Sequence, residues 1–221
     1  MSGPAYLKGQ AILTDSVPKL KMFIPTMVRV GGDVLGLART AIDKNRDPWE
    51  VQAEIDIHRY FLAAEFGGEV ARYTDDDYKY KSEGTYWRFG ADINIIPREA
   101  FGSVLYFGLR YGKSTFSEEL LGTVNDPVWG DLEIESYNDM AVAEWYEIVT
   151  GMKAKVWKNL YMGYALRVKA SLKIENSAEL EIEPFQIPGY GLGTQDFFFG
   201  INYYIAWRFQ FQKKYMVPKK P

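Results

Sequence analysis

The chain has 221 residues, of which 47% are hydrophobic and 16% aromatic, so it can bury a sizeable core and is not a disordered chain. It contains no cysteine, which excludes disulfides, thiolate metal sites and cysteine nucleophiles. The net charge of −3, from 26 basic and 29 acidic residues, gives no reason to expect a nucleic-acid partner.

The N-terminal residues 1–25 precede the first regular pattern, and we expect them to form an extension. No apolar run in the chain approaches the roughly 18 residues that a membrane helix requires. The opening MSGPAYLKGQ lacks the charged and apolar regions of a signal peptide, so an exported protein would be present in its mature form, with an added Met1.

From residue 26 onward, apolar and polar residues alternate with a period of two, which predicts strands and no convincing helix. We expect strands at 26–39, 49–57, 61–73, 86–95, 103–114, 144–157, 161–174 and 196–209. The Gly31-Gly32 pair predicts a bulge in the first strand. Most of these segments reach the roughly 9–11 residues that a tilted strand needs to cross a bilayer.

The connections between these segments alternate between long and short. Tight turns are expected at HRY, IPREAFG and KNL, and long loops after the first, third, fifth and seventh strands. Long loops on one side and short turns on the other are typical of bacterial outer-membrane barrels, although a soluble meander can share the pattern. The sequence therefore predicts one all-β domain over 26–209, an eight-stranded antiparallel up-and-down transmembrane barrel, followed by a basic tail at 210–221.

The two faces of the strands differ in size and polarity. The last strand presents seven bulky apolar or aromatic residues on one side: Phe197, Phe199, Ile201, Tyr203, Ile205, Trp207 and Phe209. An eight-stranded barrel has an interior just wide enough for side chains to fill it, so these residues would overfill the lumen and are expected to face lipid. A soluble lipocalin-like barrel, with its apolar face inside, is the alternative.

The opposite face is polar and segregated by charge. The acidic residues fall on the second and third strands, and the basic ones on the fifth to seventh: Glu50, Glu54, Asp56, Glu65 and Glu69 against Arg110, Lys153, Lys155, Arg167 and Lys169. These walls would face each other across the lumen, so we expect an ion-pair network that closes it. A proton or ion path is the alternative interpretation of the same residues.

Tryptophans lie near the predicted strand ends. Trp49, Trp87 and Trp145 fall on the long-loop side, and Trp157 and Trp207 on the tight-turn side. We interpret these residues as two aromatic girdles at the membrane interfaces.

Candidate chemistry is sparse. The only histidine, His58, lies in a predicted short turn without a nearby serine, and no HExxH, P-loop or GxSxG motif occurs, so we expect no catalytic residues. Asp75, Asp76 and Asp77 could supply oxygen ligands to Ca²⁺ in an extracellular loop, and a solvated loop tip is the alternative. The segment 115–143 mixes acidic and apolar residues, which suggests a folded loop on the barrel rim or on a partner. The IPGYG segment suggests a fixed turn with an aromatic anchor.

Several segments carry a family resemblance. The aromatic ending YYIAWRF looks like the last strand of outer-membrane barrels, and FGLRYGKS, VWKNLYMGYALRVK and IPGYG…FFFGINYYIAWRF together resemble an uncharacterised family of Bacteroidota outer-membrane barrels. The resemblance implies a fold and a place in the outer membrane, and it brings no known activity.

We therefore expect an integral outer-membrane protein with periplasmic termini, in contact with membrane lipid and lipopolysaccharide. The expected role is a non-enzymatic structural or accessory subunit that binds other outer-membrane or periplasmic proteins. A lipid-modifying outer-membrane enzyme and the soluble lipocalin-like binder remain alternatives.

Overall fold

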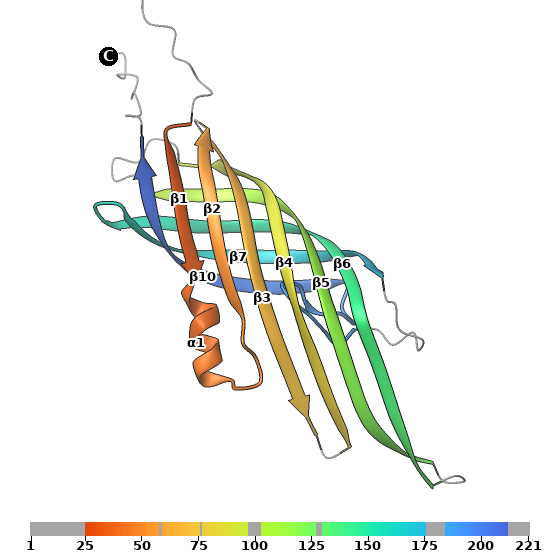
Figure 1. The fold of residues 1–221 in the computed structure, drawn as a ribbon. Coiled ribbons are helices and arrows are strands. Elements are labelled where there is room, and N and C mark those ends of the chain that lie inside the picture. The colour runs from red at the N-terminus through yellow and green to blue at the C-terminus, as the bar shows by residue number, and fades with distance from the viewer. Residues whose placement is uncertain are drawn as a thin grey trace, which may run out of the picture.

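Eight antiparallel strands close into a barrel (Figure 1). The computed structural model describes residues 25–57, 59–75, 77–96, 103–126, 130–175 and 184–211. The barrel strands are β1 (Met27–Asp33), β2 (Trp49–Ile57), β3 (Tyr60–Thr74), β4 (Tyr78–Asn94), β5 (Val104–Asp126), β6 (Gly130–Trp157), β7 (Leu160–Glu175) and β10 (Phe197–Gln210). Each strand pairs with its neighbours along the chain, and pairing of β1 with β10 closes the ring. The eight-stranded antiparallel up-and-down barrel predicted from the sequence is confirmed.

The barrel wall separates an apolar outer surface from an ionic interior. Exposure alternates residue by residue along β2, as the two-residue period of a strand requires. Phe199 on β10 is 74% exposed, whereas the side chain of Glu54 on β2 is only 3% exposed. This arrangement is the inverse of a lipocalin-like barrel, so the soluble alternative is wrong about which face is enclosed.

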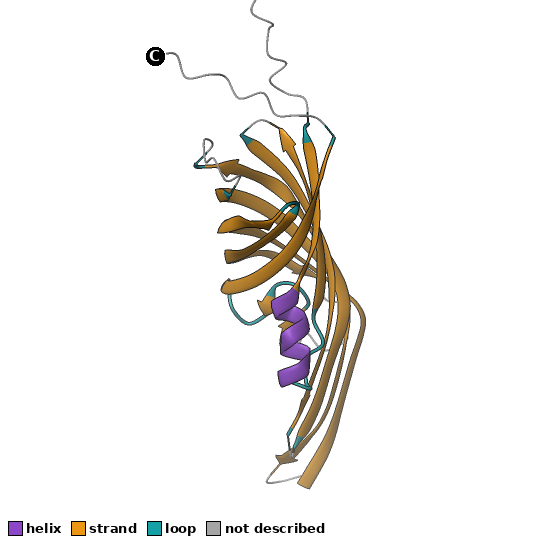
Figure 2. Ribbon diagram, turned by 90° about the vertical axis from the view of Figure 1, so that its left-hand side faces the viewer, coloured by secondary structure: helices purple, strands orange, loops and turns teal. Residues whose placement is uncertain are grey.

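The first predicted strand is wrong beyond residue 33. Residues Val34–Ile42 form the helix α1, which lies beside the barrel wall (Figure 2). Asp33 caps its N-terminus, because its carboxylate accepts a hydrogen bond of 3.0 Å from the backbone N–H of Leu35. The segment LGLARTA is rich in Leu, Ala and Arg, which are good helix formers, so local propensity and the cap outweigh the apparent alternation.

Strands β3 to β6 extend well beyond the rest of the barrel (Figure 1). The expected loop at 115–143 instead continues the β5–β6 hairpin, whose register runs to the pair Asp126↔Gly130 with one irregularity between Phe116 and Glu118. The β3–β4 hairpin likewise continues to the pair Thr74↔Lys79. Acidic residues suggested loops here, but the alternation persists through them, and two antiparallel strands can pair without crossing a membrane.

The connection before β10 turns back into the barrel mouth. It contains the short strands β8 (Gln186–Ile187) and β9 (Gly191–Leu192), which pair only with each other. Ile187 and Tyr190 are buried against Tyr86 and Trp145 of the barrel wall. The IPGYG segment, interpreted from the sequence as a fixed turn, therefore lies inside the mouth.

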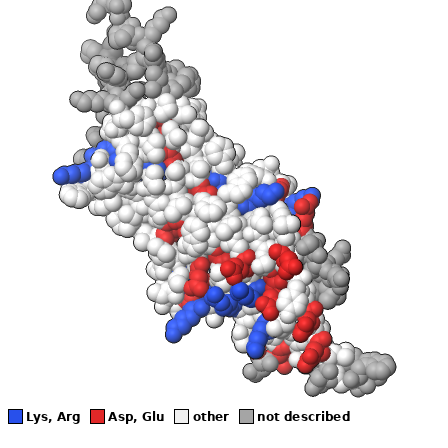
Figure 3. All heavy atoms as spheres, in the orientation of Figure 1, with Lys and Arg blue, Asp and Glu red and all other residues white. Residues whose placement is uncertain are grey.

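The outer surface is uneven in charge. In the view of Figure 3, the upper half is mostly uncharged, and Asp, Glu, Lys and Arg gather toward the lower end. That end carries α1 and the projecting hairpins (Figure 1). Within the described part of the chain, no helix combines the length and the apolar character that crossing a membrane would demand.

Candidate functional site

The centre of the lumen holds three arginines that bridge carboxylates from different strands. Arg88 Nε lies 2.7 Å from Glu65 Oε2, and the same guanidinium pairs with Glu50 and, at 3.3 Å, with Glu147. Arg167 joins Glu65 at 3.0 Å and Glu147 at 2.7 Å. These side chains are almost completely buried, so each charge depends on its partners for stabilisation.

The network connects opposite walls of the barrel. Glu65 on β3 meets Arg167 on β7, across the lumen from it in the strand order. Arg110 on β5 lies 2.7 Å from Asp92 on β4 and 3.5 Å from Glu65. The structure therefore brings Glu50, Glu65, Arg110 and Arg167 of the predicted set into one cluster.

Neutral side chains complete this cluster. The Tyr86 hydroxyl donates to Glu50 at 2.6 Å, and the Tyr204 hydroxyl donates to the other oxygen of Glu50 at 2.5 Å. The Trp145 indole N–H donates to Glu147 at 2.7 Å. The central carboxylates thus combine ion pairs with neutral donors, which low-dielectric surroundings require.

A second cluster lies toward the end where β1 begins and β10 ends. Glu54 pairs with both Arg29 and Lys153. Asp56, expected in the ion-pair network, accepts hydrogen bonds from the backbone N–H groups of Thr26 and Met27, at 2.8 and 2.7 Å. Asp56 therefore fixes the chain where it enters β1.

A third cluster lies at the opposite mouth. Glu69 pairs with Arg46 from the α1–β2 connection, and Gln186 Nε2 lies 3.4 Å from Glu69 Oε1. Lys169 was expected to pair with an acidic residue, but it donates to the backbone carbonyls of Gly189 and Tyr190, at 2.6 and 2.9 Å. Lys169 is correctly placed in the interior, yet its hydrogen bonds hold the inserted turn, because that turn occupies the mouth above it.

Lys155 does not belong to these clusters. Its side chain is exposed, two residues beyond the buried Lys153 on β6. The β6–β7 register shifts between Lys155 and Trp157, near the end of the barrel, where a long lysine stem can extend toward water. In the β6–β7 register Lys155 lies opposite Tyr161, whose side chain is buried in the lumen, so Lys155 is on the lumen side of β6. It forms no salt bridge with the described acidic residues, and in this respect the predicted ion-pair network differs from the structure.

Trp145 is also misplaced by the sequence interpretation. Its side chain is fully buried at 0% exposure and lies against Gly112, where any Cβ atom would clash with the indole. Alternation along β6 that places Lys153 inside also places Trp145 inside, since both positions are odd-numbered. The other four girdle tryptophans face outward, at 41% exposure for Trp49, 44% for Trp87, 59% for Trp157 and 41% for Trp207.

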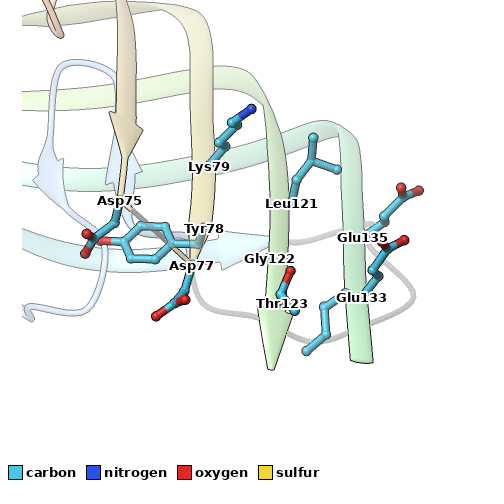
Figure 4. A pocket seen from close by; sticks show the side chains of 10 residues that line it. Asp75, Asp77, Tyr78, Lys79, Leu121, Gly122, Thr123, Glu133 and Glu135 are labelled. Carbon is cyan, nitrogen blue, oxygen red and sulfur yellow. The ribbon is translucent and has the colours of Figure 1, made fainter. Parts of the chain in front are cut away.

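Two of the three aspartates considered as Ca²⁺ ligands, Asp75 and Asp77, lie at the tip of the β3–β4 hairpin. Asp75 and Asp77 line an open hollow of about 300 Å³, with β5 and β6 residues that include Glu133 and Glu135 (Figure 4). Asp76 and His58 lie outside the described residues. In the part of the chain that the structure describes, no group of three or more His, Asp or Glu side chains could hold a metal ion.

Glu147 is the central residue that the sequence interpretation missed. It follows Tyr146 and precedes Ile148, and both of these neighbours are exposed. The signal for Glu147 was present, because a carboxylate between two outward-facing residues of a strand must face the lumen. Asn202 was missed as well, and it bridges Arg167 and Asp33 at 2.8 and 2.7 Å.

Comparison with known proteins identifies the family. A model for a domain of unknown function, DUF6048, matches residues 5–214, and the chain belongs to that family. Among curated proteins, none matches the sequence.

Two solved structures are similar in part. Neisserial surface protein A is 12% identical, with 85% of this chain and 96% of that chain covered and a TM-score of 0.40. Acinetobacter baumannii CarO2 is also 12% identical, with 85% and 99% covered and a TM-score of 0.43.

Proposed function

We propose that this chain is an integral outer-membrane β-barrel without enzymatic activity, which serves as a structural or accessory subunit of a larger outer-membrane complex. The observation that carries the proposal is the inverted barrel, with apolar side chains outside and ion pairs inside. In this proposal both termini are periplasmic, and the outer surface contacts membrane lipid and lipopolysaccharide.

The outward-facing residues support a membrane location. Large apolar side chains are exposed around the ring, including Phe89 at 53%, Leu109 at 61%, Ile148 at 47% and Leu166 at 45%. Contiguous apolar surface on this scale is unfavourable in water, whereas hydrocarbon accepts it. Trp49, Trp157 and Trp207 lie near the ends of their strands, and Trp87, within β4, lies close to the level of Trp49 in the sheet register, so the four outward tryptophans suit two interfaces.

The interior argues against transport through the barrel. Buried ion pairs and the inserted β8–β9 turn fill the path that a solute would take. Every carboxylate of the central cluster is engaged by a cation or a hydrogen-bond donor. We therefore assign the ionic residues a structural role within this proposal.

The projecting hairpins supply a surface for a protein partner. Among the described residues, the β6–β7 pairing runs to the pair Val142↔Glu175, and β6 continues past that pair to Gly130. This stretch exposes Leu132 at 46% and Tyr137 at 54%. Exposed strand edges with apolar side chains are common points of protein association.

A native pull-down tests this role. The tagged full-length chain would be extracted from its source membrane in a mild detergent, alone and with the double substitution Leu132→Ser and Tyr137→Ser. The proposal expects specific co-purifying membrane proteins that are lost with this variant. Tyr60→Ser, at an exposed residue of the opposite barrel end, is the matched control and should retain them. A monodisperse barrel without partners would contradict the accessory role, and recovery without detergent would contradict the membrane location.

A further inference from the structure

Two arginines lie side by side at the end of the barrel where the chain enters and leaves it. Arg29 on β1 and Arg208 on β10 are registered partners across the seam that closes the ring. Both belong to the inward-facing positions of their strands, and Arg29 is only 2% exposed. Like charges at directly opposed positions repel each other unless something neutralises them.

One aromatic ring serves both guanidinium groups. The guanidinium carbons of Arg29 and Arg208 lie 5.2 and 5.5 Å from the centroid of the Tyr161 ring. Phe61 contacts Arg29 in the same way, at 4.9 Å. These contacts favour positive charge on the ring faces, but they leave the in-plane N–H groups of the guanidinium to other partners.

Several of those N–H groups have no acceptor among the described residues. Arg29 uses Nε for Glu54, whereas its buried Nη1 and Nη2 atoms make no hydrogen bond. Arg208 donates from Nη1 to the Tyr161 hydroxyl at 3.0 Å and from Nη2 to Asn159 Oδ1 at 3.1 Å. Its buried Nε also makes no hydrogen bond. A buried charged donor without an acceptor is unfavourable, so these N–H groups favour a ligand that accepts hydrogen bonds.

The local charges indicate the sign of that ligand. Glu54 is shared between Arg29 and Lys153, and Asp56 is occupied by the backbone N–H groups at the start of β1. Among the described residues of these contacts, the cations Arg29, Lys153 and Arg208 therefore meet the carboxylates of Glu54 and Asp56, and Arg208 forms no ion pair with a described acidic residue. Water would satisfy the donors but would leave the surplus charge.

We propose that Arg29 and Arg208 form a binding site for a phosphate-type oxyanion at this mouth of the lumen. Guanidinium groups present paired N–H donors that match the oxygens of phosphate, and two of them together offer both charge and geometry. Trp207 precedes Arg208 and faces outward at 41% exposure, so the site lies level with the aromatic residues on the outer surface. The anion is therefore either free phosphate or the head group of a membrane phospholipid.

Thermal unfolding of the purified full-length barrel in a neutral detergent tests the site. Phosphate titrated against sodium chloride of equal ionic strength should raise the unfolding midpoint of the unmodified protein saturably. Arg208→Gln removes a half-buried side chain that forms no ion pair with the described acidic residues, and it should weaken the apparent phosphate affinity by at least about tenfold. Arg59→Gln, an exposed arginine near the same end, is the control and should leave the phosphate effect unchanged.

A second series distinguishes the two sources of phosphate. Micelles doped with phosphatidylglycerol would be compared with micelles doped with diacylglycerol, which lacks the phosphate. Stabilisation by free phosphate supports a soluble anion, and stabilisation by phosphatidylglycerol alone supports a lipid head group, provided that Arg208→Gln abolishes the effect. The proposal is overturned if neither additive stabilises the barrel, or if the stabilisation persists in both Arg208→Gln and Arg29→Gln.

Discussion

At the scale of single residues, the buried carboxylates do most to hold the lumen together. Glu147 contacts Arg88 at 3.3 Å, Arg167 at 2.7 Å and the Trp145 indole at 2.7 Å. Its removal would leave two guanidinium groups with reduced compensation in a nearly water-free interior. Breaking a buried pair by deleting one partner typically costs about 3–5 kcal/mol, far more than the pair contributes relative to an apolar filling.

Glu147→Ala should therefore lower the free energy of unfolding by about 3–5 kcal/mol, measured by urea denaturation of the barrel in lipid vesicles. Glu144→Ala on the same strand is the matched control, because Glu144 pairs with Lys113 at a half-exposed position. The control should cost less than about 1 kcal/mol. Equal losses for the two variants would contradict a central role for the lumen network.

Glu118 provides a pH-dependent contact where the projecting part of β5 meets Tyr80 of β4 beside the inserted β8–β9 turn. Burial raises the pKa of the Glu118 carboxyl above its ordinary value. Hydrogen bonds from the Tyr80 hydroxyl, the Asn138 side chain and the Phe185 N–H lower this pKa, but the effect of burial is larger. The folded state therefore binds this proton more tightly than the unfolded chain does. The stability of the contact is greatest near and below the ordinary carboxyl pKa, and it decreases as the pH rises through the raised value.

The backbone N–H of Gln186 reports on this contact, because it donates to the Tyr80 hydroxyl at 3.1 Å. Its hydrogen-exchange protection factor, corrected for intrinsic exchange, should decrease between pH 5 and pH 8. Glu118→Gln should flatten that dependence, whereas Glu119→Gln on the adjacent position should preserve it. A protection factor with the same pH profile in all three proteins would refute the assignment.

At the scale of elements, the register explains what α1 replaces. β1 ends with the pair Asp33↔Tyr204, so an extension through 34–40 would pair with Phe197–Tyr203 of β10. Residues 34–40 form part of the helix instead, and the backbone N–H of Tyr203 donates to the Asp33 carboxylate at 3.0 Å. Asp33 therefore both caps the helix and ends the strand pairing.

Engineered disulfides distinguish helix from strand at this point, since the chain has no cysteine of its own. Val30→Cys with Trp207→Cys joins registered partners and should oxidise to a disulfide. Gly36→Cys with Ile201→Cys would pair only if β1 continued as a strand, so we expect these thiols to remain free. Mobility on non-reducing gels measures both outcomes, and efficient crosslinking of the second pair would mean that α1 is not stable as a helix.

The elements that the sequence predicted well share a continuous two-residue period. The strand at 49–57 is reproduced without change, and those at 61–73, 161–174 and 196–209 differ by one residue at their ends. The helix was missed because Asp33 acts through a cap and through cross-strand contacts, which alternation does not reveal. The long hairpins were missed because acidic residues were interpreted as loop residues, although strands outside a membrane can carry charge on both faces.

The same distinction applies to the lumen. Alternation was sufficient to enclose Glu50, Glu54, Glu65, Arg110 and Arg167. It could not show that Lys169 binds an inserted turn or that Asp56 binds the entering backbone, since both partners come from connections without a regular pattern. Trp145 was assigned to the membrane surface by residue type, whereas the alternation of its own strand places its side chain inside, as the structure has it.

At the scale of the whole molecule, the filled interior predicts that the barrel does not conduct ions across a bilayer. The purified barrel reconstituted in planar bilayers should show no stable open state of porin size, because ion pairs between opposite strands cross the lumen. The alternative of a conducting path requires a stable single-channel current that depends on these residues. Such a current in the unmodified protein would contradict a structural role for the ionic residues.

One strand of the barrel, β1, is paired less extensively than the others and should be the first to separate. β1 is held by seven registered pairs to β10 and by five to β2, whereas seventeen pairs join β4 to β5. Because β1 and β10 are the first and last strands of the barrel and are paired with each other, tension applied along the chain through these two strands acts directly on β1, which has the fewest registered pairs. Mechanical or thermal opening should therefore begin by peeling β1 away, and the four long strands on the far side would be the last to separate.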